Sequence, residues 1–563
     1  MKLTGAQILM EVLKEEGVTD VFGFPGGATI DMHNSIVKTD IRHYLARHEQ
    51  GAVHAADGYA RVTGKVGVSI VTSGPGATNT VTGIATAYTD SIPLVVICGQ
   101  VATHLIGNDA FQEVDIVGIT RPCTKHNYLV PSVEELPRML REAFHIARSG
   151  RPGPVLVDIP KDVQKQMTVY KPQQKVRLKS YNPTYKPNIK QIQKVVDLIM
   201  EAERPIIFAG GGVILSGGAA AMTQLAHSTG IPVTMSLMGL GAFPGTDPLS
   251  LGMVGMHGTY RANMSTAQCD LLIGIGVRFD DRVTGKTDCF ADQAKIVHID
   301  IDPTSIRKNV PVSVPVVGDC KNSLEMLNAL LADVDLEALR KRHAPWLETI
   351  DGWRRQYRMA YAQEPDGDIK PQFVVEKLYE ITRGNAIITT EVGQNQMWAA
   401  QFYHVDRPRQ FITSGGLGTM GFGLPAAIGA QVAFPDALVV DVAGDGSIQM
   451  NIQEMATAMQ YQLPVKVVIL NNRFLGMVRQ WQELFYDKCY ACTELDHAPD
   501  FVKLAEAFGA TGFRATRSDE VEAVLRKGLE TPGPVIMDFQ VAREECVYPM
   551  VPAGAPITEM LLV

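Results

Sequence analysis

Short apolar runs typical of buried strands alternate along the chain with segments in which apolar residues recur at helical spacing. The stretch from Ala437 to Arg473 shows the pattern. Its runs ALVVDVA and VKVVIL flank a segment whose residues Ile452, Met455, Ala456 and Met459 would form one helix face. Repeated alternation of this kind predicts an α/β protein with parallel sheets.

Two stretches interrupt the alternation and are expected to be connectors. Residues 165–190 are rich in Lys, Pro and Gln, and residues 343–371 are charged and aromatic. A chain of 563 residues is too long for one core. We therefore expect three doubly wound parallel-sheet domains and a tail, with the boundaries 1–165, 190–345, 370–545 and 546–563.

The first and third blocks share a unit of strand, glycine turn, helix and strand. Residues 66–99 contain Gly-Pro-Gly where residues 437–473 contain Gly-Asp-Gly. Gly74 corresponds to Gly444, and Pro93 corresponds to Pro464. One shared βαβ unit can arise by chance, but the matched Gly and Pro positions favour a duplicated domain.

Composition and charge exclude several classes of function. The net charge is −8 with mixed signs and no basic stripe, which argues against nucleic-acid binding. The eight cysteines lack CxxC spacing and are expected to be reduced thiols, without a disulfide frame or a zinc site. The N-terminal segment is an amphipathic helix with acidic residues, unlike a targeting peptide, and no apolar run approaches membrane-spanning length. We expect a cytoplasmic protein.

Polar residues follow the two strands of the stretch from Ala437 to Arg473. Asp445 and Asn472 stand at the carboxyl ends of these strands, where parallel sheets bind ligands. A carboxylate and an amide oxygen suit Mg²⁺ with a phosphate, and the flanking glycines allow the backbone to approach one closely. Asn451 and Glu454 form a capping-box pattern for the following helix. The alternative, ordinary turn residues at two strand ends, stays open on these residues alone.

The middle block contains a glycine cluster after a strand, in PIIFAGGGVILSGG, which includes Gly211. Such a cluster accommodates a nucleotide diphosphate at the following helix, or simply makes a tight turn. The cluster alone does not decide between them.

The Gly-Asp-Gly sequence, followed at this distance by Asn-Asn, resembles the thiamine diphosphate (ThDP) binding motif. The resemblance implies Mg²⁺ bound by Asp445, Asn472 and the backbone carbonyl of Phe474. It also implies that Glu49, in RHEQGAVHAADGYAR, hydrogen-bonds the aminopyrimidine ring and so promotes loss of the cofactor's C2 proton. Met420, in SGGLGTMGFG, matches the apolar residue that holds the cofactor bent.

Across essentially the whole chain the sequence is similar to acetohydroxyacid synthase (acetolactate synthase) catalytic subunits. The stretches that carry this resemblance are VFGFPGGA, RHEQGAVHAADGYAR, RPCTKHNYLV, GRPGPVLVDIPKDVQ, GMHGTYRANM, GVRFDDRVTG and GMVRQWQ. It implies a transferase that decarboxylates pyruvate on ThDP and joins the hydroxyethyl unit to a second 2-keto acid. Pyruvate would give 2-acetolactate and 2-oxobutyrate would give 2-aceto-2-hydroxybutyrate, in branched-chain amino acid biosynthesis.

The resemblance also assigns roles to other residues. Arg282 would grip the acceptor's carboxylate, and Trp481, Met477 and Phe111 would surround its alkyl group. Gln112 would lie near the reacting centre of ThDP, and Lys161 would lie at the channel mouth. Further cofactor contacts are implied for Gly26, Gln394, Gly444, Gly446 and Ser447.

A non-redox FAD is implied as well, although the net reaction moves no electrons. Its expected contacts are Arg151, Gly211, His257, Arg278, Asp300 and Asp319. For each residue the alternative is ordinary: a solvated charge, a turn glycine or a core side chain.

In this family the site lies between two subunits, so a homodimer or homotetramer is expected, with a separate small regulatory subunit as a further partner. Three other functions stay open on the sequence. They are an FAD-dependent pyruvate oxidase or dehydrogenase, a catabolic acetolactate synthase without FAD, and a nucleotide-binding protein without catalysis. The RFDDRVTG stretch and Trp481 argue against the first, and the RFDDRVTG stretch also argues against the second. Intact Glu49, Asp445 and Asn472 argue against the third.

Overall fold

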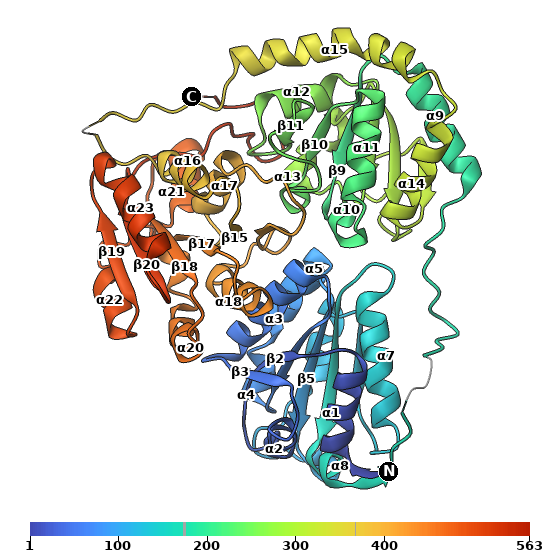
Figure 1. Ribbon diagram of the computed structural model, residues 1–563, viewed down its shortest axis with the longest axis vertical. Helices are drawn as coiled ribbons and strands as arrows, with labels where there is room; N and C mark the ends of the chain where they lie inside the picture. Colours follow the sequence, from blue (N-terminus) through green and yellow to red (C-terminus); the bar gives the residue numbers. More distant parts are fainter. Residues whose placement is uncertain (173–175, 366, 563) are drawn as a thin grey trace.

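In the computed structural model, which describes residues 1–172, 176–365 and 367–562, the chain forms three α/β units (Figure 1). Each unit contains a six-stranded parallel sheet flanked by helices. The expected fold class is thereby confirmed. The domain boundaries themselves stay a prediction. Residues 173–175 of the first expected connector, residue 366 of the second and residue 563 of the expected tail lie outside the described residues.

The N-terminal unit has the strand order β3-β2-β4-β5-β7-β6. Its strands are β2 Asp20–Phe24, β3 Arg42–Leu45, β4 Gly67–Val71, β5 Leu94–Gln100, β6 His126–Leu129 and β7 Pro154–Pro160. Its helices are α1 Gly5–Glu15, α2 Ile30–Ile36, α3 Glu49–Thr63, α4 Pro75–Thr78, α5 Val81–Asp90, α6 Ile116–Thr120, α7 Leu136–Arg148 and α8 Lys161–Lys165, with 3₁₀ turns at Thr103–Leu105 and Arg121–Cys123. A separate antiparallel pair joins β1 Lys2–Thr4 to β8 Met167–Val169.

The central unit has the order β11-β10-β9-β12-β13-β14. Its strands are β9 Pro205–Ala209, β10 Val233–Met235, β11 Ser250–Met253, β12 Leu271–Ile275, β13 Lys295–Asp300 and β14 Val314–Val317. Its helices are α9 Ile189–Glu201, α10 Gly211–Ser216, α11 Ala219–Thr229, α12 Tyr260–Gln268, α13 Asp281–Thr284, α14 Cys320–Leu331 and α15 Leu336–Gln356, with 3₁₀ turns at Leu237–Gly239 and Thr287–Cys289.

The C-terminal unit has the order β16-β15-β17-β18-β20-β19. Its strands are β15 Ile387–Thr390, β16 Phe411–Ile412, β17 Val439–Gly444, β18 Lys466–Asn471, β19 Thr511–Ala515 and β20 Val535–Gln540. Its helices are α16 Pro371–Thr382, α17 Gln394–Phe402, α18 Gly423–Ala433, α19 Asp445–Ile448, α20 Met455–Gln460, α21 Gly476–Phe485, α22 Phe501–Ala507 and α23 Val521–Glu530, with 3₁₀ turns at Ile452–Glu454 and Ser518–Glu520.

The first and third sheets have the same strand order when each is numbered from its own first strand. The Gly-Pro-Gly turn follows β4 and the Gly-Asp-Gly turn follows β17, which occupy the same place in their sheets. This correspondence supports the duplication predicted from the matched Gly and Pro residues. The central sheet has a different order, so it is not a third copy.

The N-terminal and C-terminal units are held together by α3 and α18, which lie against each other (Figure 1). The approach is close because glycine stands at the contact in both helices. A Cβ on Gly58 would lie 2.6 Å from the Cα of Ala426, and one on Gly429 would lie 1.9 Å from the carbonyl oxygen of Ala55. The many small residues of α3 and α18 therefore serve this contact, and their apolar neighbours form one shared core cluster.

The structure corrects the expectation of a connector at residues 343–371. Residues up to Gln356 belong to α15, whose side chains His343, Trp346 and Ile350 are buried on the central unit. These positions follow helical spacing, but the many charged residues between them hid the apolar stripe.

The chain then crosses to the C-terminal unit and finally returns to the central one. There Val551 donates a hydrogen bond from its backbone N–H to Met256 O at 2.8 Å, and Ile557 joins a core cluster of that unit. In the described part of the chain, no helix has the length and apolar character needed to cross a membrane.

Candidate functional site

Two adjoining cavities open at the carboxyl ends of the second and third sheets. The order of strands reverses between β15 and β17 in one sheet and between β9 and β12 in the other, and such switch points are where α/β sheets bind ligands. The smaller cavity has a volume of about 90 Å³ and the larger about 880 Å³. Met420 and Met477 line both, so the two cavities share a wall.

The smaller cavity brings together the residues expected to hold a metal and a diphosphate. Those that line it are Gln394, Met420, Gly444, Asp445, Gly446, Ser447, Asn472, Phe474 and Met477. Met420 lies in the loop after β16 and the others follow β15, β17 and β18, because parallel strands place their carboxyl ends on one edge of the sheet.

Asp445 is the first residue of α19, and its side chain is buried. Its Oδ2 has no hydrogen-bond partner among the described residues. Burial raises the pKa of this carboxyl to about 7, and the backbone N–H groups of Asn472 and Arg473 counteract part of that rise. A buried carboxylate oxygen without a partner costs free energy, and a bound cation would remove that cost.

The neighbouring residues complete a donor set for a hard cation. Asn472 donates from Nδ2 to Gln394 Oε1 at 3.0 Å, and its Oδ1 accepts the backbone N–H of Phe474 at 3.1 Å. This arrangement fixes the amide oxygen beside the backbone of Phe474. Across the described residues, no cluster of three or more His, Cys, Asp and Glu side chains could hold a metal. A cation bound here would therefore use amide and carbonyl oxygens together with Asp445.

Two guanidinium groups lie close to the ring of Phe474. The guanidinium of Arg479 lies 5.4 Å from the ring centroid, and that of Arg543 lies 4.7 Å from it. A Cβ on Gly476, two residues later, would lie 2.0 Å from Gln394 Oε1 and 2.7 Å from Asn472 Nδ2, so it would displace these hydrogen-bonded amide groups. The residues present thus fit a metal with a phosphate group.

The larger cavity is lined by all three units. The predicted residues on its wall are Arg151, Gly211, His257, Arg278, Arg282, Asp300, Asp319, Met420, Met477 and Trp481. Arg151 is held by Ser91, whose Oγ accepts from Nε at 2.8 Å, and by an ion pair with Asp302 at 3.2 Å. Burial lowers the pKa of His257 to about 4, so its ring is neutral at pH 7 and contacts Pro549 O at 3.2 Å.

Two acidic residues of this wall differ in their environment. Burial raises the pKa of Asp300 to about 6. Asp319 caps α14, because its Oδ1 accepts the backbone N–H of Asn322 at 3.0 Å. The glycine turn after β9 also faces this cavity, and a Cβ on Gly212 would lie 2.6 Å from the Cα of Gly276. A cavity of this size, with glycine turns and both charge signs on its wall, suits an extended polar ligand.

Arg282 and Trp481 meet on the wall of the larger cavity. The guanidinium carbon of Arg282 lies 5.8 Å from the centroid of the indole. The side chain of Arg282 is 58% exposed, and within the described residues its ion-pair partner is Asp281, at 3.8 Å. Its donors are therefore largely available to a carboxylate, which would place the rest of a small ligand beside the indole.

Five predicted residues line neither cavity. They are Gly26, Glu49, Phe111, Gln112 and Lys161, all in the N-terminal unit. Glu49 is buried at the start of α3, and its Oε2 accepts a hydrogen bond from Asn79 Nδ2 at 2.9 Å. Gln112 packs on the turn after β4, where a Cβ on Gly74 would lie 2.9 Å from its Cα. Phe111 is 88% exposed, and Lys161 begins α8.

The predicted capping box is wrong. Asn451 makes no cap, and Glu454 instead accepts the backbone N–H groups of Arg47 and His48, both at 3.0 Å. The reason is that Glu454 ends a 3₁₀ turn at the contact between two units, where the residues before α3 offer unpaired donors. The C-terminal unit thus fixes the backbone beside Glu49.

Sequence reasoning missed the loop from Ser414 to Gly418, which lines the larger cavity, and the end of α5 at Asp90 and Ser91. The loop carries a signal that could have revealed it, namely three glycines in four positions after an apolar run. The end of α5 carries no such signal, since the loop residues that Asp90 contacts lie more than 300 residues away in the chain.

Comparisons with known proteins agree with this geometry. Three family models of thiamine pyrophosphate enzymes match the chain: the N-terminal TPP binding domain at residues 3–119, the central domain at 192–327 and the C-terminal TPP binding domain at 391–539. An acetolactate synthase large subunit of Haemophilus influenzae is 50% identical over 565 residues, which cover 100% of this chain and 98% of that protein.

Two further relatives show the same breadth of similarity. The acetolactate synthase isozyme 3 large subunit of Escherichia coli is 48% identical over 100% of the chain and 98% of its own length. A chloroplastic acetolactate synthase 2 of Nicotiana tabacum is 49% identical over 99% of the chain and 85% of its own length.

Proposed function

The chain belongs to the acetolactate synthase large subunits of the thiamine pyrophosphate enzyme family, and on that premise we propose which of its residues carry the reaction. The proposed reaction decarboxylates one pyruvate and joins its two-carbon unit to a second 2-keto acid, either pyruvate or 2-oxobutyrate. The observation that carries this proposal is the contact between Arg282 and Trp481 in the larger cavity. Met420 and Met477 separate this contact from Asp445, which lines the smaller cavity.

The smaller cavity would hold Mg²⁺ and the diphosphate of ThDP through Asp445, Asn472 and the carbonyl of Phe474. When bound, ThDP would supply the nucleophilic carbon and the electron sink that the decarboxylation of pyruvate needs. The chain's own part would be to support the cofactor with the side chain of Met420 and to orient the diphosphate through the backbone of Gly444, Gly446 and Ser447. Gln394 would hold Asn472 in the orientation that the cation needs.

We propose that Arg282 binds the acceptor's carboxylate and that Trp481 and Met477 contact its alkyl group. Both keto acids carry the same carboxylate, so Arg282 would bind either, and the indole would distinguish them by one methylene. The apolar side chains around the reacting carbon would exclude water, which would otherwise protonate the two-carbon unit.

A second copy of the chain would complete this site. Gly26, Glu49, Phe111, Gln112 and Lys161 line neither cavity of their own chain, which supports a homodimer in which they face the partner's cofactor. Glu49 would then hydrogen-bond the aminopyrimidine ring and help to move the C2 proton. The names of the relatives describe large subunits, and we propose a separate small subunit as a partner.

We further propose that FAD occupies the larger cavity without redox change, held by Arg151, Gly211, His257, Arg278, Asp300 and Asp319. The neutral His257 and the glycine turns fit an uncharged ring system and a diphosphate, respectively. We also propose a cytoplasmic location, where the eight free cysteines would stay reduced.

The test is a competition assay with ThDP, Mg²⁺, FAD, pyruvate and 2-oxobutyrate, in which the products are identified. We expect 2-acetolactate and 2-aceto-2-hydroxybutyrate. Acetate or acetyl phosphate, with bleaching of the flavin absorbance when pyruvate is added without oxygen, would show an oxidase instead. Full activity in a colourless protein without FAD would remove the flavin from the proposal.

A further inference from the structure

The loop from Thr413 to Met420 forms the boundary between the two cavities. Gly415, Gly416 and Gly418 line the larger cavity, while Met420 lines both. The loop lies between β16 and α18 and forms neither helix nor strand. Glycine restricts backbone conformation very little, so the loop's position must come from contacts with its surroundings.

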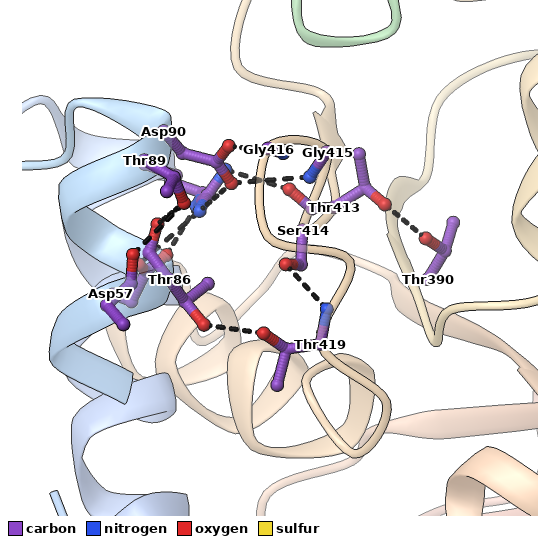
Figure 2. A network of polar contacts seen from close by, with 12 residues as sticks. Asp57, Thr86, Thr89, Asp90, Thr390, Thr413, Ser414, Gly415, Gly416 and Thr419 are labelled. Atoms are coloured by element: carbon purple, nitrogen blue, oxygen red, sulfur yellow. Dashed lines mark hydrogen bonds and ion pairs between the residues drawn. The ribbon is translucent and has the colours of Figure 1, made fainter. Parts of the chain in front are cut away.

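The N-terminal unit supplies several of these contacts, and Figure 2 shows those that Asp90 and Thr86 make with the loop. Asp90, the last residue of α5, accepts the backbone N–H of Gly416 at 2.7 Å and that of Gly415 at 3.3 Å. One turn earlier, the hydroxyl of Thr86 contacts that of Thr419 at 2.7 Å, directly before Met420.

A buried ion cluster fixes Asp90 in turn. Arg61 of α3 donates to Asp90 Oδ2 at 2.8 Å, forms an ion pair with Asp57, and donates to the carbonyl of Thr413 at 2.8 Å. An aspartate at the C-terminal end of a helix is disfavoured by the helix dipole. Here the loop's two N–H groups and Arg61 compensate for that position.

We propose that Asp90 and Thr86 of α5 are positioning residues that hold the loop, and through it Met420, in the conformation that accepts ThDP. This inference rests on the proposed ThDP site. Neither residue needs to touch the cofactor, since each acts through the backbone or side chain of the loop.

The chain offers a matched control in Asp57. Asp57 and Asp90 are both buried and both pair with Arg61, but only Asp90 contacts the loop. Both carboxylate oxygens of Asp90 accept hydrogen bonds from N–H groups. In Asp90→Asn an NH₂ group replaces one of these oxygens, so one of the N–H donors would lose its acceptor. Asp57→Asn removes the same charge from the same cluster and leaves the bonds to Gly415 and Gly416 in place.

The experiment measures ThDP binding to the Mg²⁺-loaded protein by titration calorimetry, and unfolding by urea, for the wild type, Asp90→Asn, Asp57→Asn and Thr86→Val. Loss of one charge-assisted hydrogen bond predicts that Asp90→Asn raises the dissociation constant of ThDP about 10- to 100-fold. Thr86→Val should raise it roughly 3- to 10-fold, as loss of a neutral hydrogen bond predicts. Asp57→Asn should stay within about threefold of the wild type, because loop bonds are unchanged.

Steady-state kinetics separate positioning from general damage. A displaced loop raises the ThDP concentration needed for half-maximal rate and leaves kcat at saturating ThDP within a few fold, whereas partial unfolding lowers kcat alone. Equal losses of affinity in Asp90→Asn and Asp57→Asn, or wild-type affinity in Asp90→Asn, would overturn the proposal. If Asp90→Asn does not fold, the test rests on Thr86→Val. Wild-type affinity for ThDP in that variant would likewise overturn the proposal. Absence of ThDP binding in the wild type would instead refute the proposed function.

Discussion

Trp481→Leu should lower the preference for 2-oxobutyrate over pyruvate as the acceptor. The two keto acids differ by one methylene, and the contact of Arg282 with the indole, at 5.8 Å, places a bound carboxylate next to this side chain. Burial of a methylene contributes about 0.8 kcal/mol, and a shaped pocket distinguishes one methylene by about 1–3 kcal/mol. We therefore expect the product ratio to shift roughly tenfold, within limits of about 4- and 150-fold.

The loss of the cation–π contact does not affect this ratio. That contact is worth about 0.5–1 kcal/mol at an exposed site, and Arg282 would bind the same carboxylate in both acceptors. Its effect therefore cancels when the two products are compared. It should appear separately, as a modest rise in KM for either acceptor.

The assay supplies both keto acids at several ratios and divides the ratio of the two products by the ratio of the two substrates. Phe485→Leu is the matched control. Its ring makes an edge contact with Trp481 at 6.1 Å on the same helix, is 40% exposed and lines neither cavity. A ratio within twofold of the wild type in Trp481→Leu, or an equal shift in Phe485→Leu, would refute the placement of the indole beside the acceptor.

Three further predictions concern single residues. Arg282→Lys should raise KM for the acceptor about 10- to 100-fold, because an ammonium cannot form the paired hydrogen bonds of a guanidinium, while CO₂ release from pyruvate continues; an unchanged KM would exclude this contact. Glu49→Gln should slow exchange of the C2 proton of bound ThDP by about 10²–10⁴-fold in deuterated solvent, and exchange at the wild-type rate would exclude its proposed role. Burial raises the pKa of the Glu391 carboxyl, so the stability that this group contributes is complete below its unfolded pKa and is lost as pH rises through the raised pKa. Between pH 5 and 8 the wild type should thus lose unfolding free energy relative to Glu391→Gln, measured by urea titration, and parallel curves for the two proteins would contradict this.

The features that local sequence could predict are those whose partners lie nearby in the chain. Asp445 and Asn472 follow consecutive strands of one βαβ unit, so strand pattern and sheet geometry together placed them at one edge. Matched glycines predicted the equivalence of the first and third sheets for the same reason. Composition misled where charge surrounded a sparse apolar stripe, as in α15.

The larger cavity could not be derived in this way. Its wall combines Arg151, Arg278 and the loop at Gly415–Gly418, which come from three units. Each has an ordinary local explanation, and the residues acquire a shared function only after the sheets pack together. The wrong prediction of a capping box at Glu454 has the same origin. Its carboxylate accepts hydrogen bonds from backbone N–H groups more than 400 residues away in the chain.

Contacts between the first and third units bear on both halves of the proposed site. Glu454 accepts hydrogen bonds from the backbone before Glu49, and Asp90 accepts them from the loop before Met420, so each unit contacts a segment of the other that carries a proposed site residue. In the proposed dimer, Glu49 would contact the partner's cofactor, while Met420 would contact the cofactor of its own chain. The backbones of α3 and α18 are in contact, so the two units are packed tightly together. Movement of the segment that carries Glu49 would therefore displace the segment that carries Met420. Geometry at the two sites of the dimer would therefore be linked through each chain, without contact between the cofactors.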